Sequence, residues 1–177
     1  MTVKIHVPNR RQLGIGAATA GVLLLAVLVW VSVPGAAEFR GKVVGVSDGD
    51  TITVLRDRRP EKIRLLGIDA PEKGQPFGER AKQFTSSLAF RREVTVRVTG
   101  HDRYGRTVAD VVLLDGRSLS RELVRAGYAW WYRQYSTDGT LEDLERHARG
   151  ARAGLWTDGH PVPPWEWRRA KQAMAKP

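Results

Sequence analysis

Five acidic residues stand at three turn-like places in the chain, where carboxylates can do chemistry. Asp48-Gly49-Asp50 is a turn signal between two runs rich in β-branched residues. Asp69 and Glu72 follow a third such run, and Asp102 lies further along. The chain has no Cys and no pair of His residues at metal spacing. Carboxylates in this setting are hard oxygen ligands, which suit Ca²⁺ or Mg²⁺ and not zinc.

Two arginines lie beside these acids. Arg64 precedes Asp69, and Arg106 follows Asp102. A guanidinium can bind two phosphate oxygens at once, so a metal ion, a carboxylate base and two arginines together can hydrolyse a phosphodiester. Each pattern also has a plain structural explanation: a hairpin turn, a turn into a helix, or a surface pair of Arg106 with Asp102. The combination of all of them in a basic domain favours the chemical interpretation.

The rest of the sequence predicts the elements that must position these residues. Alternating apolar and β-branched residues predict five strands, over residues 39–47, 51–55, 61–68, 93–98 and 107–114. Apolar residues at helical spacing predict three helices, over residues 79–90, 118–126 and 140–153. Thr140 is the predicted cap of the last one. Together these elements predict an α+β, mainly β, fold: a closed or partly closed antiparallel barrel of five strands with three packed helices.

Composition and charge limit the class of protein. The 177 residues allow one globular domain and little more. With 29 Lys and Arg against 19 Asp and Glu, the formal net charge is +10, and the absence of Cys excludes a disulfide framework and a cysteine nucleophile. Residues 38–177 hold all 19 acids and still carry an excess of bases. The expected partner is therefore a nucleic acid or an anionic membrane surface.

Residues 13–33 contain no charged side chain and, as a helix of about 30 Å, would be long enough to cross a membrane. The basic residues before this segment fit an uncleaved anchor whose N-terminus stays in the cytoplasm. A short basic start and small residues up to Ala37 also fit a cleaved signal peptide, and a buried soluble helix is the third option. The expected location is the cytoplasmic membrane with the globular domain outside, or a secreted or periplasmic form after cleavage near Ala37.

These features divide the chain into five parts: a basic cytoplasmic tail over 1–12, the anchor or signal segment over 13–33, a linker over 34–38, a globular domain over 39–157 and a tail over 158–177. The last part is rich in Pro, Trp and basic residues. We expect it to be extended at first and then to form a short basic and aromatic piece that frays towards its end.

The motifs, taken together, resemble those of the staphylococcal nuclease (thermonuclease) family. The resemblance covers about residues 38–168 and rests on motifs in the order of the family: Asp48-Gly49-Asp50-Thr51, Ile63-Arg64-Leu65-Leu66-Gly67-Ile68-Asp69-Ala70-Pro71-Glu72, Asp102-Arg103-Tyr104-Gly105-Arg106, Leu123-Val124-Arg125-Ala126-Gly127-Tyr128-Ala129, Gly154-Leu155-Trp156 and Pro163-Pro164-Trp165-Glu166-Trp167-Arg168. It implies an oligonucleotide/oligosaccharide-binding barrel of five strands with three helices, here preceded by one N-terminal transmembrane or signal helix.

The resemblance also implies a role for each matching acid. Asp50 and Asp69 resemble direct ligands of Ca²⁺. Ala70 stands where the family uses a backbone carbonyl as a ligand, and a backbone ligand tolerates Ala. Asp48 resembles an acid that holds metal-bound water. Glu72 resembles the carboxylate that activates or positions the attacking water.

The resemblance assigns the remaining positions to the substrate. Arg64 and Arg106 resemble the two arginines that act on the scissile phosphate. Arg103 and Tyr104 lie where the family contacts a terminal phosphate. Tyr135 lies where an aromatic ring stacks on a base.

The implied function is a Ca²⁺-dependent hydrolase that cleaves single- and double-stranded DNA and RNA with little sequence specificity and leaves 3′-phosphates. A catalytically weak or inactive nucleic-acid-binding module is the alternative. Such modules have typically lost an acid or an arginine of the set, and this chain keeps them all. A membrane-bound domain for anionic lipid or a cell-wall polymer would explain the charge but not the acids. We expect a monomer with no protein partner. Removal of the N-terminal segment and the preference between DNA and RNA stay open.

Overall fold

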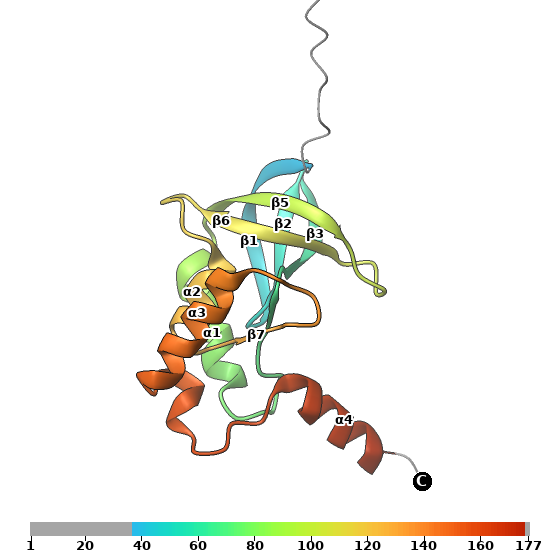
Figure 1. Ribbon diagram of the computed structural model, residues 1–177. Helices are drawn as coiled ribbons and strands as arrows, with labels where there is room; N and C mark the ends of the chain where they lie inside the picture. The colour runs from blue at the N-terminus through green and yellow to red at the C-terminus, as the bar shows by residue number, and fades with distance from the viewer. Residues whose placement is uncertain (1–36, 176–177) are drawn as a thin grey trace, which may run out of the picture. The chain divides into compact units, whose positions relative to one another are not determined.

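The computed structural model describes residues 37–175, and its centre is a closed barrel of five strands (Figure 1). The strands follow one another around the barrel in the order β1-β2-β3-β6-β5. Two further strands, β4 and β7, pair in a small separate sheet. The strands are β1 (Glu38–Asp48), β2 (Thr51–Arg56), β3 (Arg59–Leu65), β4 (Ile68–Asp69), β5 (Glu93–His101), β6 (Thr107–Leu113) and β7 (Trp130–Trp131).

Alternation of side chains along the strands fills the barrel. In β6 every second residue is buried, from Thr107 to Leu113. Val43, Ile52 and Ile63 are fully buried, and Ile52 is paired with Ile63 across β2 and β3. Because strand side chains alternate between two faces, this pattern places one face of every strand in a shared apolar core. The prediction of five barrel strands is therefore confirmed.

One pairing differs from the predicted antiparallel barrel. Strands β3 and β6 pair in parallel, with Ile63 opposite Thr107 and Leu65 opposite Ala109. The chain between them runs through β4, the first helix and β5 before it returns. Parallel neighbours need such a long crossover, whereas hairpins join antiparallel neighbours. The sequence shows local hairpins, but it does not show which strand closes the barrel.

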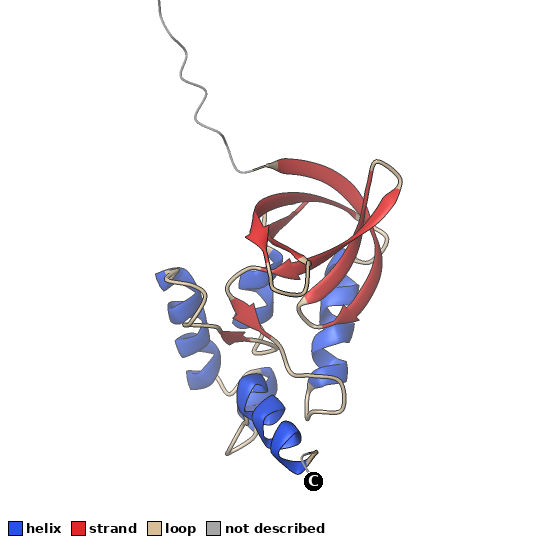
Figure 2. Cartoon of the chain, turned by 90° about the vertical axis from the view of Figure 1, so that its right-hand side faces the viewer, coloured by secondary structure: helices blue, strands red, loops and turns tan. Residues whose placement is uncertain are grey.

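Within residues 37–175, four α-helices accompany the barrel, and three of them, α1, α2 and α3, gather at one of its ends (Figures 1 and 2). Helices α1 (Gly78–Ala89), α2 (Leu119–Arg125) and α3 (Gly139–Gly150) lie where the sequence predicts them. The cap of α3, however, is Asp138 and not Thr140: the Asp138 carboxylate accepts a hydrogen bond from the Thr140 backbone N–H at 2.9 Å. Asp caps a helix by the same chemistry as Thr.

The fourth helix, α4 (Pro164–Met174), corrects the prediction of an extended tail with a short basic and aromatic end. Pro164 occupies the first turn, where the fixed φ of proline suits a helix and its missing N–H costs nothing. Glu166 in the first turn and Lys171 in the last turn agree with the helix dipole. The helix also has a tertiary anchor, because Trp165 packs on the cluster of buried aromatic residues that contains Trp130.

The predicted third strand is broken in two, and the break positions the site. Strand β3 ends at Leu65, and β4 begins at Ile68 after a turn at Gly67. Gly67 has a φ of +76°, and a Cβ on it would lie 2.9 Å from the Leu141 side chain, so glycine is required there. Strand β4 then pairs with β7 instead of continuing the barrel, which brings Asp69 opposite Trp130.

The predicted membrane or signal segment, residues 13–33, lies outside the described residues. Within residues 37–175, no helix combines the length and the apolar character that a membrane span requires.

Candidate active site

The structure brings every residue that the sequence predicted for the site to one cleft of about 680 Å³. The turn between β1 and β2 contributes acids, β3 and the segment from β4 onward contribute further charges, and the loop between β5 and β6 reaches in from the other side. The ten predicted residues that line the cleft are Asp48, Asp50, Arg64, Asp69, Ala70, Glu72, Arg103, Tyr104, Arg106 and Tyr135. Four segments far apart in the sequence thus meet at one place.

Arg64 stands between the two central aspartates. Its Nη2 donates a hydrogen bond to Asp69 Oδ1 at 2.8 Å, and its Nη1 lies against the Asp50 carboxylate. The strand register explains the placement, because Arg64 is paired with Thr51, the residue after Asp50. Arg64 Nη1 is buried and has no partner in good hydrogen-bond geometry. Asp50 and Asp69 together therefore hold this guanidinium at the wall of the cleft.

Asp50 ties the first hairpin to the segment after β4. Its Oδ2 accepts a hydrogen bond from the Ala70 backbone N–H at 2.7 Å, and its Oδ1 accepts one from the Thr51 hydroxyl at 3.1 Å. The hairpin approaches so closely that a Cβ on Gly49 would lie 2.7 Å from the Ala70 Cβ. The hairpin also packs on α1, where the Thr85 hydroxyl donates to the Gly49 carbonyl. The position of Asp50 is thus fixed from three sides.

Two carboxyl groups of the cleft, Asp48 and Asp69, resist ionisation. Burial, and next the negative charge of Asp50, raise the pKa of Asp48 to about 7. Burial also raises the pKa of Asp69, although Arg168 and Arg64 act in the opposite direction. Buried carboxylates that crowd one another are costly unless a cation compensates them. The cleft is therefore built for additional positive charge.

The donor set fits a hard divalent cation by its chemistry. Asp48, Asp50, Asp69 and the carbonyl of Ala70 offer only oxygen atoms, as Ca²⁺ prefers. Among the described residues, however, no three acidic or His side chains converge closely enough to hold an ion as they stand. Arginines hold the carboxylate oxygens instead, and a bound ion would have to take their place at Asp69.

Glu72 and Arg106 lie at the edges of the cleft. The Glu72 backbone N–H donates to Gln75 Oε1 at 3.0 Å, which fixes the loop that carries it. Arg106 donates from Nε to Asp102 Oδ2 at 2.7 Å and reaches the Thr51 hydroxyl from Nη1 at 3.4 Å. Arg106 thus forms the pair with Asp102 that a plain structural explanation expects, and it lines the cleft as well.

Arg168, to which sequence analysis assigned no role, lines the cleft in the structure. Arg168 Nη2 donates to Asp69 Oδ2 at 2.8 Å, and Nη1 donates to Glu72 Oε1 at 2.5 Å. Partial burial of the guanidinium lowers the pKa of Arg168, but the hydrogen bonds and charges of these two carboxylates outweigh burial and raise the pKa above its usual range. A helix start at Pro164 would put Arg168 one turn into a helix, but nothing local indicates that this helix folds back on residues almost a hundred positions earlier.

Tyr132 is a second residue of the cleft to which the sequence assigned no part in catalysis or binding. Its ring stacks on Trp165 of α4 with 5.3 Å between the ring centroids and an interplanar angle of 3°. Tyr132 and Arg168 line both the acidic cleft and a second groove beside it. Trp130 belongs to the core, and Tyr132 lies at the rim.

Comparison with known proteins agrees with this architecture. A family model described as "Staphylococcal nuclease homologue" matches residues 62–158, more than half of the chain. "Protein ParB" of Escherichia coli is 48% identical over 155 residues, which cover 82% of this chain and 87% of that protein. "Micrococcal nuclease" of Shigella flexneri is 45% identical over 157 residues (83% and 90%). An "Uncharacterized endonuclease" of Escherichia coli O157:H7 is 47% identical over 135 residues (76% and 88%). With this match and this degree of identity, the chain belongs to the staphylococcal nuclease family.

Proposed function

We propose that this protein is a Ca²⁺-dependent nuclease that hydrolyses phosphodiester bonds of DNA and RNA with little sequence specificity. The observation that carries the proposal is the single cleft in which two arginines, Arg64 and Arg106, face the carboxylate Glu72 and the central aspartates. Membership of the family and relatives named as nuclease and endonuclease support hydrolysis as the reaction.

The two arginines stabilise the charge that grows on the phosphate during the reaction. Arg64 is only 13% exposed and is held by both Asp50 and Asp69, so its guanidinium is already oriented at the wall of the cleft. Arg106 is oriented by Asp102. Preorganised donors of this kind act mainly on the transition state, and the loss of one typically costs about 10²–10³ in rate.

Glu72 is the acid that positions and deprotonates the attacking water. Its side chain is 38% exposed at the edge of the cleft, so a water molecule can reach it. When Glu72 accepts the proton, the water oxygen bonds to phosphorus, the bond from phosphorus to the 5′ oxygen breaks, and the leaving 5′ oxygen takes up a proton from solvent water. A carboxylate within one water of the reacting atom can carry out such a transfer. The proposed products therefore carry 3′-phosphates.

Asp50, Asp69 and the carbonyl of Ala70 are the proposed ligands of Ca²⁺, with Asp48 holding a water of the ion. When bound, the ion supplies positive charge that polarises the phosphate and compensates the crowded carboxylates. Burial raises the pKa of Asp48 and of Asp69, which supports this assignment because a bound cation would favour the ionised form of both groups.

The test compares turnover with binding in the purified full chain. Glu72→Gln and Arg106→Ala should each lose at least about 100-fold in kcat on a DNA substrate and on an RNA substrate. Both should keep most of their weak affinity for DNA. Arg40→Ala, an exposed arginine on β1 outside the cleft, is the matched control and should cleave like the wild type. Equal turnover in all four proteins would assign the activity to a contaminant and refute the proposal.

We also propose that residues 13–33 anchor the protein in the cytoplasmic membrane with the catalytic domain outside. The basic residues before this segment favour a cytoplasmic N-terminus. A nonspecific nuclease on the outer side is separated from the genome of its own cell. Protease added to spheroplasts should therefore digest the catalytic domain. If the domain survives until the membrane is lysed, the proposed orientation is wrong.

A further inference from the structure

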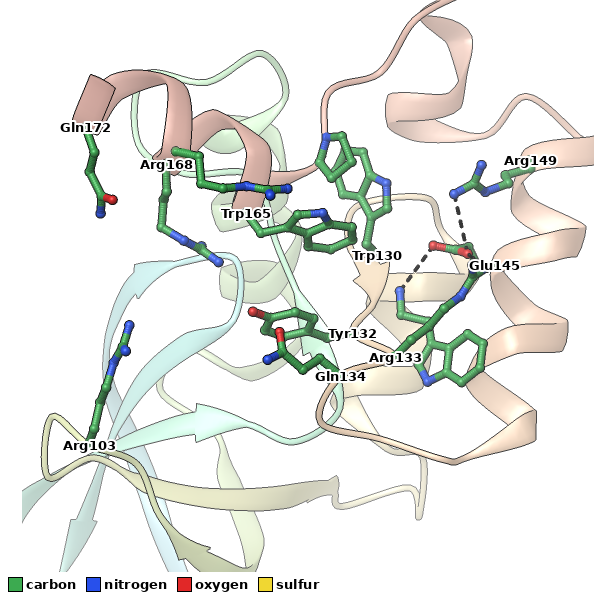
Figure 3. Close-up of a pocket in the computed structure, with 13 residues that line it drawn as sticks. Arg103, Trp130, Tyr132, Arg133, Gln134, Glu145, Arg149, Trp165, Arg168 and Gln172 are labelled. Atoms are coloured by element: carbon green, nitrogen blue, oxygen red, sulfur yellow. Dashed lines mark hydrogen bonds and ion pairs between the residues drawn. The ribbon is translucent and has the colours of Figure 1, made fainter. Parts of the chain in front are cut away.

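A second groove, of about 500 Å³, lies beside the acidic cleft and is formed largely by α4 and the segment around β7 (Figure 3). Arg103, Tyr132 and Arg168 line both the groove and the cleft, so the two are continuous. The family model ends at residue 158, whereas α4 begins at Pro164. The α4 side of this groove therefore lies outside the residues that the family model matches.

The groove carries an excess of positive charge. Five arginines line it, and Glu145 is its acid. Arg133 and Arg149 pair with Glu145, and Arg168 pairs with the acids of the cleft. Among the ion pairs of the described residues, none involves Arg169. Arg169 is exposed on α4, and its charge is available to an anion that enters the groove.

The groove also offers flat aromatic surface. Trp165 and Tyr132 stack in parallel, and Figure 3 shows the two rings side by side between α4 and the strand segment below it. Both residues are half-buried and line the groove. Trp165 is also braced by Trp130, whose ring meets it edge-on at 6.5 Å. A braced aromatic pair beside unpaired positive charge is the arrangement on which single-stranded nucleic acids bind.

The side chain of Gln75 fixes the start of α4 relative to the loop that carries Glu72. Gln75 Nε2 donates to the Val162 carbonyl at 2.7 Å, just before α4, and Gln75 Oε1 accepts from the Glu72 backbone N–H. One side chain thus connects the start of α4 to the loop of Glu72. A strand bound along α4 is therefore placed at a fixed distance from the acids that would cleave it.

We propose that this groove binds single-stranded DNA or RNA next to the cleaved bond, with a phosphate on Arg169 and a base on the Trp165–Tyr132 pair. The inference rests on the proposed nuclease function and assigns to the enzyme a binding subsite built by α4. The single strand is favoured over the duplex because only unstacked bases can lie on an aromatic ring.

The test measures how tightly the full chain binds fluorescent oligothymidylates of two to twelve nucleotides. The measurement is made in the presence of chelator, and a gel verifies that the oligonucleotides are not cleaved. Trp165→Leu should weaken binding of the twelve-nucleotide strand by about 5- to 100-fold, the range expected for loss of one stacked base. Arg169→Ala should lower the slope of log Kd against log salt concentration by about 0.7, the value for one phosphate contact on a single strand. Arg40→Ala, outside the groove, should leave that slope unchanged.

Several outcomes would overturn the inference. If Arg169→Ala and Arg40→Ala change the salt slope equally, the charge on α4 acts only as part of a general basic surface. If Trp165→Leu weakens binding of a duplex as much as that of the single strand, no base stacks in the groove. Because Arg169 is exposed, its variant tests the groove even if Trp165→Leu fails to fold.

The proposed function can fail separately. If the wild-type chain binds the strand as predicted but does not cleave it when Ca²⁺ is restored, the nuclease proposal is refuted and the binding groove is supported. If the chain cleaves normally and the groove variants bind like the wild type, the groove inference alone is refuted.

Discussion

Replacing Arg168 by Gln would remove the guanidinium that α4 brings to the acidic cleft. In the metal-free protein Arg168 compensates Asp69, which is only 1% exposed, and it also binds Glu72 at 2.5 Å. Calcium bound to Asp69 would compete for the same oxygens. The variant should therefore be less stable than the wild type without Ca²⁺, and it should bind Ca²⁺ more tightly.

The size of the effect follows from the contacts. Hydrogen bonds to a charged group contribute about 1.5–3 kcal/mol each when well shielded. Arg168 is 38% exposed, however, and solvent screens such a pair strongly. In the variant, Arg64 still compensates Asp69 through its 2.8 Å ion pair. We expect a net loss of about 1–2 kcal/mol, which would lower the melting temperature by about 3–8 °C for a domain of this size.

The same free energy sets the gain in metal affinity. If 1–2 kcal/mol of competing interaction is removed, the Kd for Ca²⁺ should fall by about 5- to 30-fold. Thermal unfolding in chelator and calorimetric titration with Ca²⁺ measure the two quantities on the same protein. Lys171→Gln, an exposed lysine on the same helix, is the matched control and should change neither. A weaker affinity for Ca²⁺ in Arg168→Gln would refute the reasoning, because Arg168 would then support the metal site and not compete for it.

Three further predictions concern the supports of the cleft. In chelator, the raised pKa of Asp48, about 7 against 3.8 for the ordinary group, favours a protonated carboxyl in the folded state. Stability should therefore fall as the pH rises from 4 to 7, and melting curves of Asp48→Asn should lack that part of the fall. Gly49→Ala places a Cβ 2.7 Å from the Ala70 Cβ, so urea unfolding should show a loss of about 1–3 kcal/mol, and an unchanged midpoint would contradict the close contact. Gln75→Ala removes the bond to the Val162 carbonyl, so hydrogen exchange in α4 should accelerate by about 5- to 30-fold, whereas exchange in β6 should not change.

Local patterns predicted much of the barrel. The β-branched runs gave strands within a few residues of the observed ones, because alternation reports directly which face of a strand is buried. The same local signals predicted that the third strand continues to Ile68, whereas the observed strand β3 ends at Leu65. The break depends on the close approach of Leu141 to Gly67, a contact across 74 residues that no window of sequence contains.

The cleft was predictable for a different reason. Its acids and arginines lie in short motifs at turns, and the resemblance carried them over in order, so all ten line one cleft. Their roles in catalysis stay predictions. Arg168 was not predictable in this way, because it reaches Asp69 from a helix whose placement depends on Trp165 and Trp130. Residues 13–33 lie outside the described part of the chain, so their role as an anchor or signal stays a prediction too.

The position of α4 after the end of the family match has a consequence for how this enzyme can diverge. The barrel and its cleft must keep their shape for cleavage, and most substitutions there carry a cost in folding. Helix α4 is attached through one aromatic contact cluster, the bond from Gln75 and the ion pairs of Arg168 with Asp69 and Glu72. A substitution in this short C-terminal helix therefore changes the groove and, through Arg168, also reaches the acids of the cleft. Divergence of the helix is thus coupled to the residues that it contacts.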